Sequence, residues 1–317
     1  MTRLRTADID LDATSFYHCI SRCVRRAFLC GDDSYTGRNF DYRKTWVEDR
    51  ILELARIFAV EVHAYAVMSN HVHLVVEVNT ERAKGWSDRE VLRRYAKLFP
   101  LAVKRLAHLD KATRAARVVA IRERLADLSW LMRCLNESIA RRANREDGCT
   151  GRFWEGRFRC QALLDEGAVL ACMAYVDLNP VRAGLSRSPR TSKHTSVGTR
   201  VRSARKAAKD GTSPVPAGLA PFSDQATSPR RLTLISWPDY LELLDWTARS
   251  LGGTSRKQPP DVLRRCGIDA PGFLRVMAEC RLRLSCVLGH ESALEEFAAT
   301  QGKAWVRGKA ASRQLFR

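Results

Sequence analysis

Two neighbouring stretches of alternating residues constrain the fold of this chain more than any other feature. Val60–Val67 reads VEVHAYAV and His71–Val78 reads HVHLVVEV, and only the three residues MSN separate them. Such runs of β-branched residues with a short connection predict a β-hairpin. Successive side chains of a strand point to opposite faces, so Val72, Val76 and Val78 of the second strand face a core. His71 and His73 share the other face with Val75.

The other patterns of the first 186 residues alternate between strand and helix. Strands are predicted over Phe16–Cys23 and Phe158–Leu164. Helices are predicted over Thr45–Phe58, Leu125–Asn144 and Asp165–Leu178, the last with Asp165 as N-cap and Pro180 just past its end. Because the central strand pair is a short hairpin, this order predicts an α+β fold, with a ferredoxin-like antiparallel sheet and helices packed on one face.

Composition divides the chain into four parts. Residues 10–186 form the predicted first domain, and residues 80–124, which are charged and rich in Ala, Leu and Arg, form a helical insertion in it. Residues 187–231 carry ten Lys or Arg against two Asp or Glu, with many Ser and Pro. They predict a basic flexible linker, which acts as a solubilising tether or as an arm that contacts phosphates. Residues 232–317 predict a helical C-terminal region.

The net charge of the chain indicates its class of partner. Lys and Arg number 54 and Asp and Glu 35, so the formal net charge is +19. Nucleic acid is the commonest partner of such a basic chain, and an anionic membrane is the alternative. No apolar run reaches the roughly 20 residues that span a bilayer, and the N-terminus lacks the apolar core of a signal peptide. We therefore expect an intracellular protein without membrane contact.

His71 and His73 form the first candidate site. Two strand positions separate their Cα atoms by about 7 Å, and both rings can reach one cation because metal–nitrogen bonds are about 2 Å long. The alternative is a pair of polar side chains on a solvated sheet face. Glu77 shares this face further along and is expected to be solvated. His18, on the first strand, is expected to pack or to support a ligand.

Tyr175 and Asn179 form the second candidate site, because residues four apart share one face of a helix. Tyr175 is predicted to lie away from the apolar stripe of this helix, which comprises Val169, Leu170, Met173 and Val176. A phenol attacks a phosphodiester when a metal polarises the phosphate. Two imidazoles and the Asn179 amide oxygen form a neutral ligand set that suits Mg²⁺ or Mn²⁺. The alternatives are a half-buried tyrosine and a helix-capping asparagine.

Residues 140–160, ARRANREDGCTGRFWEGRFRC, interleave arginines with aromatic residues. Arginines bind phosphates, and aromatic rings stack on unpaired bases. We expect DNA contacts from one tryptophan and four arginines, namely Trp154, Arg145, Arg152, Arg157 and Arg159. The alternative places the aromatic residues in the core, with solvated arginines around them.

The motifs NHVHLVV, GRFWEGRFRCQAL and YVDLNPVRAGL, in this order and spacing, resemble those of the REP-associated tyrosine transposases. These belong to the single-tyrosine HUH endonuclease superfamily, and the resemblance covers about residues 12–186. It implies that His71, His73 and Asn179 hold the metal and that Tyr175 is the nucleophile. It further implies cleavage of single-stranded DNA beside a hairpin, with a 5′-phosphotyrosine link and a free 3′-hydroxyl, and rejoining by reversal with another 3′-hydroxyl.

The resemblance therefore implies a transposase-like endonuclease and strand transferase that works in the bacterial cytoplasm at the nucleoid, as a monomer or a homodimer. Two rival functions remain open on the residues alone. One is a non-catalytic nucleic-acid-binding regulator of the same fold, and the other is a metal phosphodiesterase that uses water in place of tyrosine. The insertion and the C-terminal region depart from the minimal members of the family, so the DNA sequence recognised does not carry over.

Overall fold

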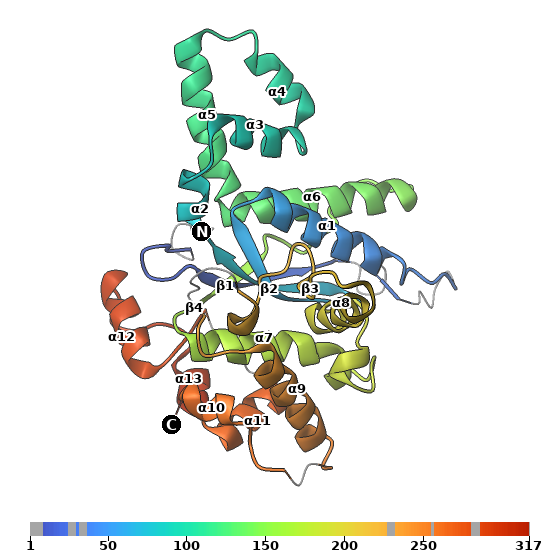
Figure 1. Cartoon of the computed structure of the whole chain (residues 1–317), viewed down its shortest axis with the longest axis vertical. Helices are drawn as coiled ribbons and strands as arrows, with labels where there is room; N and C mark the ends of the chain where they lie inside the picture. The colour runs from blue at the N-terminus through green and yellow to red at the C-terminus, as the bar shows by residue number, and fades with distance from the viewer. Residues whose placement is uncertain are drawn as a thin grey trace.

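A computed structural model describes residues 9–24, 30–31, 37–226, 232–254, 257–279 and 286–316, and the statements below concern these residues. Five strands form one sheet, with helices on both faces (Figure 1). The strands lie in the order β2-β3-β1-β4-β5 across the sheet. Their bounds are Phe16–Arg22 for β1, Val60–Val67 for β2, His71–Val78 for β3, Arg159–Leu163 for β4 and Val287–Leu288 for β5.

The first four strands have a ferredoxin-like topology. β2 and β3 form the predicted hairpin, and β1 pairs antiparallel with β3 on one side and with β4 on the other. Helix α1 (Arg43–Ile57) connects β1 to β2, and helix α6 (Leu128–Glu146) precedes β4. This β-α-β-β-α-β order with antiparallel neighbours is the split βαβ arrangement. The prediction of an α+β fold is confirmed.

One face of the sheet packs against α1 and α6. The valine and leucine side of β3 contributes to this core, as predicted, and the two helices supply their apolar sides. Asp127 caps α6 by accepting a hydrogen bond from the Trp130 backbone N–H at 3.0 Å. The buried residues that fill this layer include Leu54, Val72, Leu74, Val76 and Leu135.

The opposite face carries helix α7 (Glu166–Arg182), so the expectation that helices cover only one face is wrong. Asp165 is its N-cap, as predicted, and accepts a hydrogen bond from Ala168 at 2.8 Å. The helix continues through Pro180 and is buried at every position from 167 to 180. The predicted amphipathic stripe is therefore also wrong, because a helix buried all round belongs to the middle of a core.

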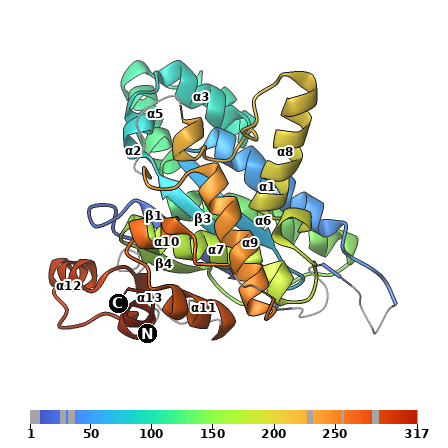
Figure 2. The ribbon, with the colours of Figure 1, turned by 60° about the horizontal axis from the view of Figure 1, so that its bottom comes forward.

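Helices of the C-terminal region cover the far side of α7 (Figure 2). Side chains of α9 (Trp237–Leu251) and α11 (Ala270–Glu279) share its core, and several have no exposed surface, including Tyr240, Leu243, Leu244 and Phe273. The remaining elements of the region are α10 (Asp261–Arg265), α12 (Glu291–Thr300) and α13 (Lys309–Leu315). Strand β5 pairs in parallel with β4 and extends the sheet. The C-terminal region is thus built into the same core, which differs from the expected separate helical region.

The segment predicted to be a flexible linker contains helix α8 (Ser196–Asp210), and only residues 227–231 of it lie outside the described residues. Asp177 of α7 fixes the start of α8 by accepting hydrogen bonds from Ser196 Oγ at 2.7 Å and from Val197 N at 3.0 Å. It also accepts one from Tyr240 Oη at 2.7 Å. Burial raises the pKa of Asp177 to about 6, although these hydrogen bonds lower it. The expectation of an unstructured tether therefore fails for this segment.

Glu48 of α1 holds the other side of α8. Its carboxylate accepts hydrogen bonds from Tyr65 at 2.6 Å and Thr199 at 2.8 Å, and it lies 2.7 Å from His194 Nδ1. Burial alone would raise the pKa of Glu48, but hydrogen bonds from His194, Tyr65 and Thr199 outweigh it. They lower the pKa from 4.5 to about 2. The ionised carboxylate therefore joins the α8 segment to the layer of α1.

The insertion after β3 forms an arm that projects from the body, at the top of Figure 1. Its helices are α2 (Thr80–Lys84), α3 (Asp88–Ala96), α4 (Pro100–Leu106) and α5 (Lys111–Leu125). Arg82 of α2 ties its base to β2 by an ion pair with Glu61 at 3.0 Å. Across the described residues, every helix is too short or too polar to cross a membrane.

The low pKa of Glu48 makes a prediction about pH. Because the folded-state pKa lies below the unfolded value, the ionised carboxylate stabilises the fold above about pH 5, and this contribution disappears as the pH falls towards 2. Its size is about 3 kcal/mol. We expect Glu48→Gln to lower the free energy of urea unfolding strongly at about pH 7 and much less at about pH 3. A loss that stays the same across this range would contradict the assignment.

Candidate functional site

The sheet face that meets α7 gathers three histidines and a tyrosine. His71 and His73 lie on β3 with ring centroids 4.7 Å apart. His18 comes from β1, and its ring stacks on that of His73 at 5.1 Å. Tyr175 approaches from α7, and its ring lies 5.9 Å from His73 and 6.3 Å from His18. Two predicted sites that are a hundred residues apart in sequence therefore meet between the sheet and this helix.

A chain of hydrogen bonds orients His73. Its Nδ1 lies 2.9 Å from His18 Nε2, and His18 Nδ1 lies 3.1 Å from Gln161 Oε1 on β4. With the Gln161 oxygen as acceptor, His18 donates from Nδ1, and its Nε2 accepts from His73 Nδ1. The Nε2 atom of His73 then carries the lone pair. This is the arrangement of a metal-binding histidine, whose second nitrogen is fixed by a hydrogen bond.

His71 is oriented by its neighbour in the hairpin turn. Its Nδ1 lies 2.6 Å from Asn70 Oδ1, which can only accept, so Nδ1 carries the proton and Nε2 is the basic nitrogen. Both imidazoles of the H-x-H pair thus present the same kind of atom. His71 is partly exposed and His73 is fully buried, so the pair is not a set of polar side chains on a solvated sheet face.

Tyr175 and Asn179 lie on the same helix, α7, and both side chains are buried. Tyr175 is 0% exposed, and the guanidinium of Arg182 lies 5.0 Å above its ring. Asn179 is also buried, and its Nδ2 donates to the carbonyl oxygen of Tyr175 at 3.2 Å. This bond leaves Oδ1 as the atom of Asn179 with ligand chemistry. Both side chains lie in the core layer, in contrast to the half-buried tyrosine and terminal cap that were the alternatives.

A cavity of about 360 Å³ opens beside the histidine pair. His71 and His73 form one wall, and the segment before β4 forms another with Arg157 and Arg159. Arg22 of β1 also lines it and pairs with Glu155 at 3.3 Å. Three arginines against one carboxylate make this cavity positive, which suits a phosphate. Arg157 and Arg159 are thus placed beside the histidine pair.

Trp154, the tryptophan among the five expected DNA contacts, lies elsewhere. Its ring is packed in the core, 4.9 Å from Phe153, and its Nε1 donates to the Asn136 carbonyl at 2.8 Å. A ring held in this way does not stack on bases, so this expectation is wrong. Arg145 and Arg152 are exposed but do not line the cavity.

Two residues of the site region were not predicted as part of it. Gln161 and Arg22 had no distinguishing pattern, because their roles depend on the pairing of β1 with β3 and β4. The pairing register sets His18 opposite Val75 on one side and Gln161 on the other. His18 was expected to pack or to support a ligand, and the structure places it where it can do both. A signal was present in the sequence, since His18 lies within a strand pattern.

The donor set has the chemistry of a divalent-metal site. His71 and His73 present Nε2 atoms, and Asn179 offers an amide oxygen; these are ligands for Mn²⁺ and, less well, for Mg²⁺. The second nitrogen of each histidine is held by a hydrogen-bond partner. The chemistry of these three residues fits the metal expected from the sequence, and the ring contact of His71 with His73 brings two of them together.

Comparisons with known proteins add little. No protein-family model matches the sequence, and a search of curated proteins gives no match. Among solved structures, one described as "Structure of the REP associates tyrosine transposase bound to a REP hairpin" is similar over 68% of this chain and 92% of that chain. The identity is 13% and the TM-score 0.31, and values this low carry no argument about function. The proposals below rest on the residues of this chain.

The hydrogen-bond chain predicts the proton positions of two histidines. We expect Nδ1 of His71 and of His73 to carry the proton near neutral pH, because each Nδ1 donates to a fixed acceptor. Nitrogen-15 spectra of histidine-labelled protein report the tautomer of each ring. His108, exposed on the arm, serves as the reference. A proton on Nε2 of either His71 or His73 would overturn the ligand assignment.

Proposed function

We propose that this protein is a metal-dependent endonuclease and strand transferase for single-stranded DNA beside hairpins, with Tyr175 as its nucleophile. The observation that carries the proposal is the contact of the Tyr175 ring with His73, beside a cavity that arginines line. A phenol, an H-x-H pair and phosphate-binding groups are the parts that this reaction needs. The sequence motifs that resemble the REP-associated tyrosine transposases contain the same residues.

Each residue has a defined task in this reaction. Arg22, Arg157 and Arg159 bind the phosphates of the strand and orient the scissile group in the cavity. A divalent ion, when bound by His71, His73 and Asn179, would polarise that phosphate. The Tyr175 oxygen forms a bond to phosphorus, the bond to the 3′-oxygen breaks, and the proton lost by the phenol is balanced by the one gained by the 3′-hydroxyl. Reversal with another 3′-hydroxyl rejoins strands, because the phosphodiester energy is kept.

The burial of Tyr175 adds a step to the cycle. A side chain that is 0% exposed cannot reach a DNA phosphate until the end of α7 moves away from β3. Pro180 lies inside this helix and has no N–H, so one backbone hydrogen bond is missing just after Tyr175. The helix is therefore weakest where it has to open, and we expect the bound strand to stabilise the open form.

A second candidate is a DNA-binding regulator without catalysis. The observation that favours it is the contrast between the buried Tyr175 and the exposed Arg157 and Arg159. Such a protein binds the strand through the arginines and never opens α7. Binding is common to both candidates, so only the covalent step separates them.

The test is the covalent adduct. The full chain is incubated with 5′- or 3′-labelled single-stranded hairpin DNA from beside its own gene, with Mn²⁺ or Mg²⁺, and run on a denaturing gel. We expect an adduct that retains the label downstream of the cut, that disappears with chelator, and that Tyr175→Phe abolishes. Because Tyr95 lies on the arm, away from the cavity, Tyr95→Phe is the matched control and keeps the adduct.

The other outcomes point to the rivals. Cleavage that survives Tyr175→Phe without an adduct would identify water as the nucleophile. Hairpins that bind tightly and are never cut, in either metal, would leave the regulator as the function. The folded state of each variant is checked by circular dichroism, since Tyr175 is part of the core.

A further inference from the structure

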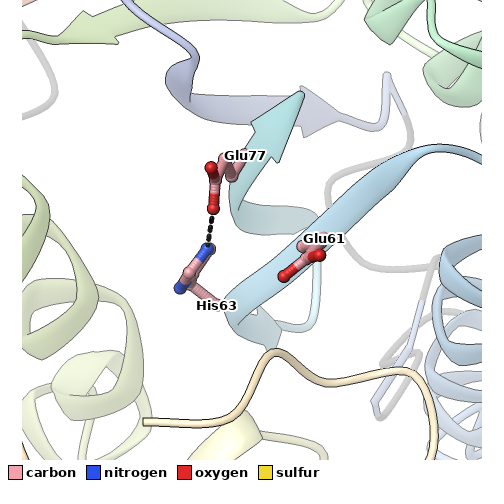
Figure 3. A group of neighbouring side chains, drawn as sticks. All are labelled: Glu61, His63 and Glu77. Carbon is pink, nitrogen blue, oxygen red and sulfur yellow. Dashed lines mark hydrogen bonds and ion pairs between the residues drawn. The ribbon is translucent and has the colours of Figure 1, made fainter. Parts of the chain in front are cut away.

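A second group of ligand-type side chains lies on β2 and β3, away from the histidine pair. Glu61, His63 and Glu77 each offer one ligand atom, and these atoms all lie within 4.8 Å of one another. In the described part of the chain this is the one group of three or more His, Cys, Asp or Glu side chains with such spacing. Figure 3 shows the three side chains converging from the two strands.

The backbone of β2 is shaped to aim His63 at this point. Glu61 pairs directly with Glu77 across the hairpin, but the register shifts between Val62 and Ala64, so His63 is the extra residue of a β-bulge. Bulges re-aim a side chain and occur often beside functional sites. The ring of His63 lies 5.5 Å from that of Phe16 on the α7 face, where Glu77 also lies. All three ligand groups therefore share one face.

The spacing within the group matches metal coordination. His63 Nε2 lies 3.3 Å from Glu77 Oε2, as the dashed line of Figure 3 marks. A tetrahedral ion with bonds of about 2.1 Å separates its ligand atoms by about 3.4 Å. A charge-assisted hydrogen bond between the same groups is shorter, at about 2.8 Å. The ligand atom of Glu61 also lies within 4.8 Å of the other two, so all three ligand groups are close enough to approach one ion.

The charges of the group also favour a cation. Two carboxylates directly opposite each other on neighbouring strands repel, and both side chains are at most 10% exposed. Arg82 of α2 pairs with Glu61 at 3.0 Å and supplies one positive charge. Arg200, which is also buried, donates to the carbonyl oxygen of His63 at 3.1 Å and is attracted to Asp177. Glu77 pairs with His63 at 3.3 Å, and a divalent ion bound between the two strands would offset the repulsion of the two carboxylates.

A route from solvent reaches the group. A cavity of about 280 Å³ adjoins it and is lined by Glu61, Arg82, Arg94 and the loop 218–221. Gly218 lets this loop lie against α1, since its φ is +96° and a Cβ there would meet the Leu52 carbonyl at 2.7 Å. This cavity therefore gives an ion access to Glu61 on the edge strand β2.

We propose that Glu61, His63 and Glu77 bind one divalent transition-metal ion of the Zn²⁺ type, with water in the fourth position. One imidazole and two carboxylates are ligands that zinc accepts. Glu77 is four strand residues from His73, about 13 Å along β3, so this site is separate from the metal expected beside Tyr175. The ion joins β2 to β3 at the base of the arm, where Arg82 anchors α2. Its role is structural, and it does not depend on the proposed cleavage reaction.

The test measures metal binding in a protein that lacks the first site. The full chain with His71→Ala and His73→Ala is titrated with Co²⁺, whose absorption reports four-coordinate binding, and the ion is then displaced with Zn²⁺. We expect one saturable site in this protein. In the same background Glu77→Gln weakens Co²⁺ binding at least about tenfold. Glu81→Gln is the matched control, because the Glu81 side chain is 71% exposed on α2, and it leaves binding unchanged.

Arg82→Gln is the second variant, and it keeps all three ligands. It removes the cation that competes for Glu61, so we expect it to tighten Co²⁺ binding. Circular dichroism confirms that each variant is folded. The proposal is overturned if the folded double variant shows no saturable Co²⁺ binding, or if Glu77→Gln and Glu81→Gln bind it equally well. Because no cleavage is measured, failure here says nothing about Tyr175, and a failed Tyr175 test leaves this site intact.

Discussion

The structure depends on one helix that is buried on all sides. α7 packs one side against the sheet and the other against α9 and α11, so no position between 167 and 180 is left in water. Such a helix is stable only while both partners are present, because its apolar surface has no solvated face. The C-terminal helices, the α8 segment and strand β5 contribute apolar residues to the core that surrounds this helix. The chain therefore has one continuous core on this side of the sheet.

The same constraint builds the site. Because α7 lies against the sheet, Tyr175 meets the ring of His73. Strand β1 brings in His18 and strand β4 brings in Gln161, and together they orient that ring. The burial that assembles these groups also closes off the tyrosine. Positive charge gathers on the open side, at Arg157 and Arg159, which line the cavity beside the histidine pair. The packing of α7 against the sheet thus both positions Tyr175 beside His73 and shields Tyr175 from solvent.

The sequence predicted what depends on local pattern. The hairpin has the predicted bounds, and the α+β class follows from the order of the elements, because strand alternation and helix periodicity are local signals. Predictions from local sequence patterns failed where contacts with residues distant in the sequence determine the structure. The basic segment 187–231 has too few apolar residues to predict a packed helix, yet Asp177 and Glu48 hold it by hydrogen bonds. Trp154 has the composition of a base-stacking residue, and only the fold shows that it fills the core.

The residues of the candidate site also fall into those that could be predicted from local sequence patterns and those that could not. His71 and His73 were predictable because their spacing on a strand has a chemical meaning, whereas Gln161 became visible only through strand pairing. Glu77 was expected to be solvated, but it lies on the sheet face that carries α7 and is only 6% exposed. Its contact with His63 depends on a β-bulge, which could not be predicted from the sequence.

The most direct test of the account is whether the C-terminal helices hold α7. Leu243 of α9 has no exposed surface and belongs to the core that surrounds α7. Leu243→Ala is predicted to lower the free energy of unfolding by about 2–5 kcal/mol, with one transition for the whole chain, seen by circular dichroism and by hydrogen exchange in β1 and β3. Leu101→Ala, at a leucine 67% exposed on the arm, is the control, with a change below about 0.5 kcal/mol. Two separate transitions, with β1 and β3 unaffected by Leu243→Ala, would contradict the account.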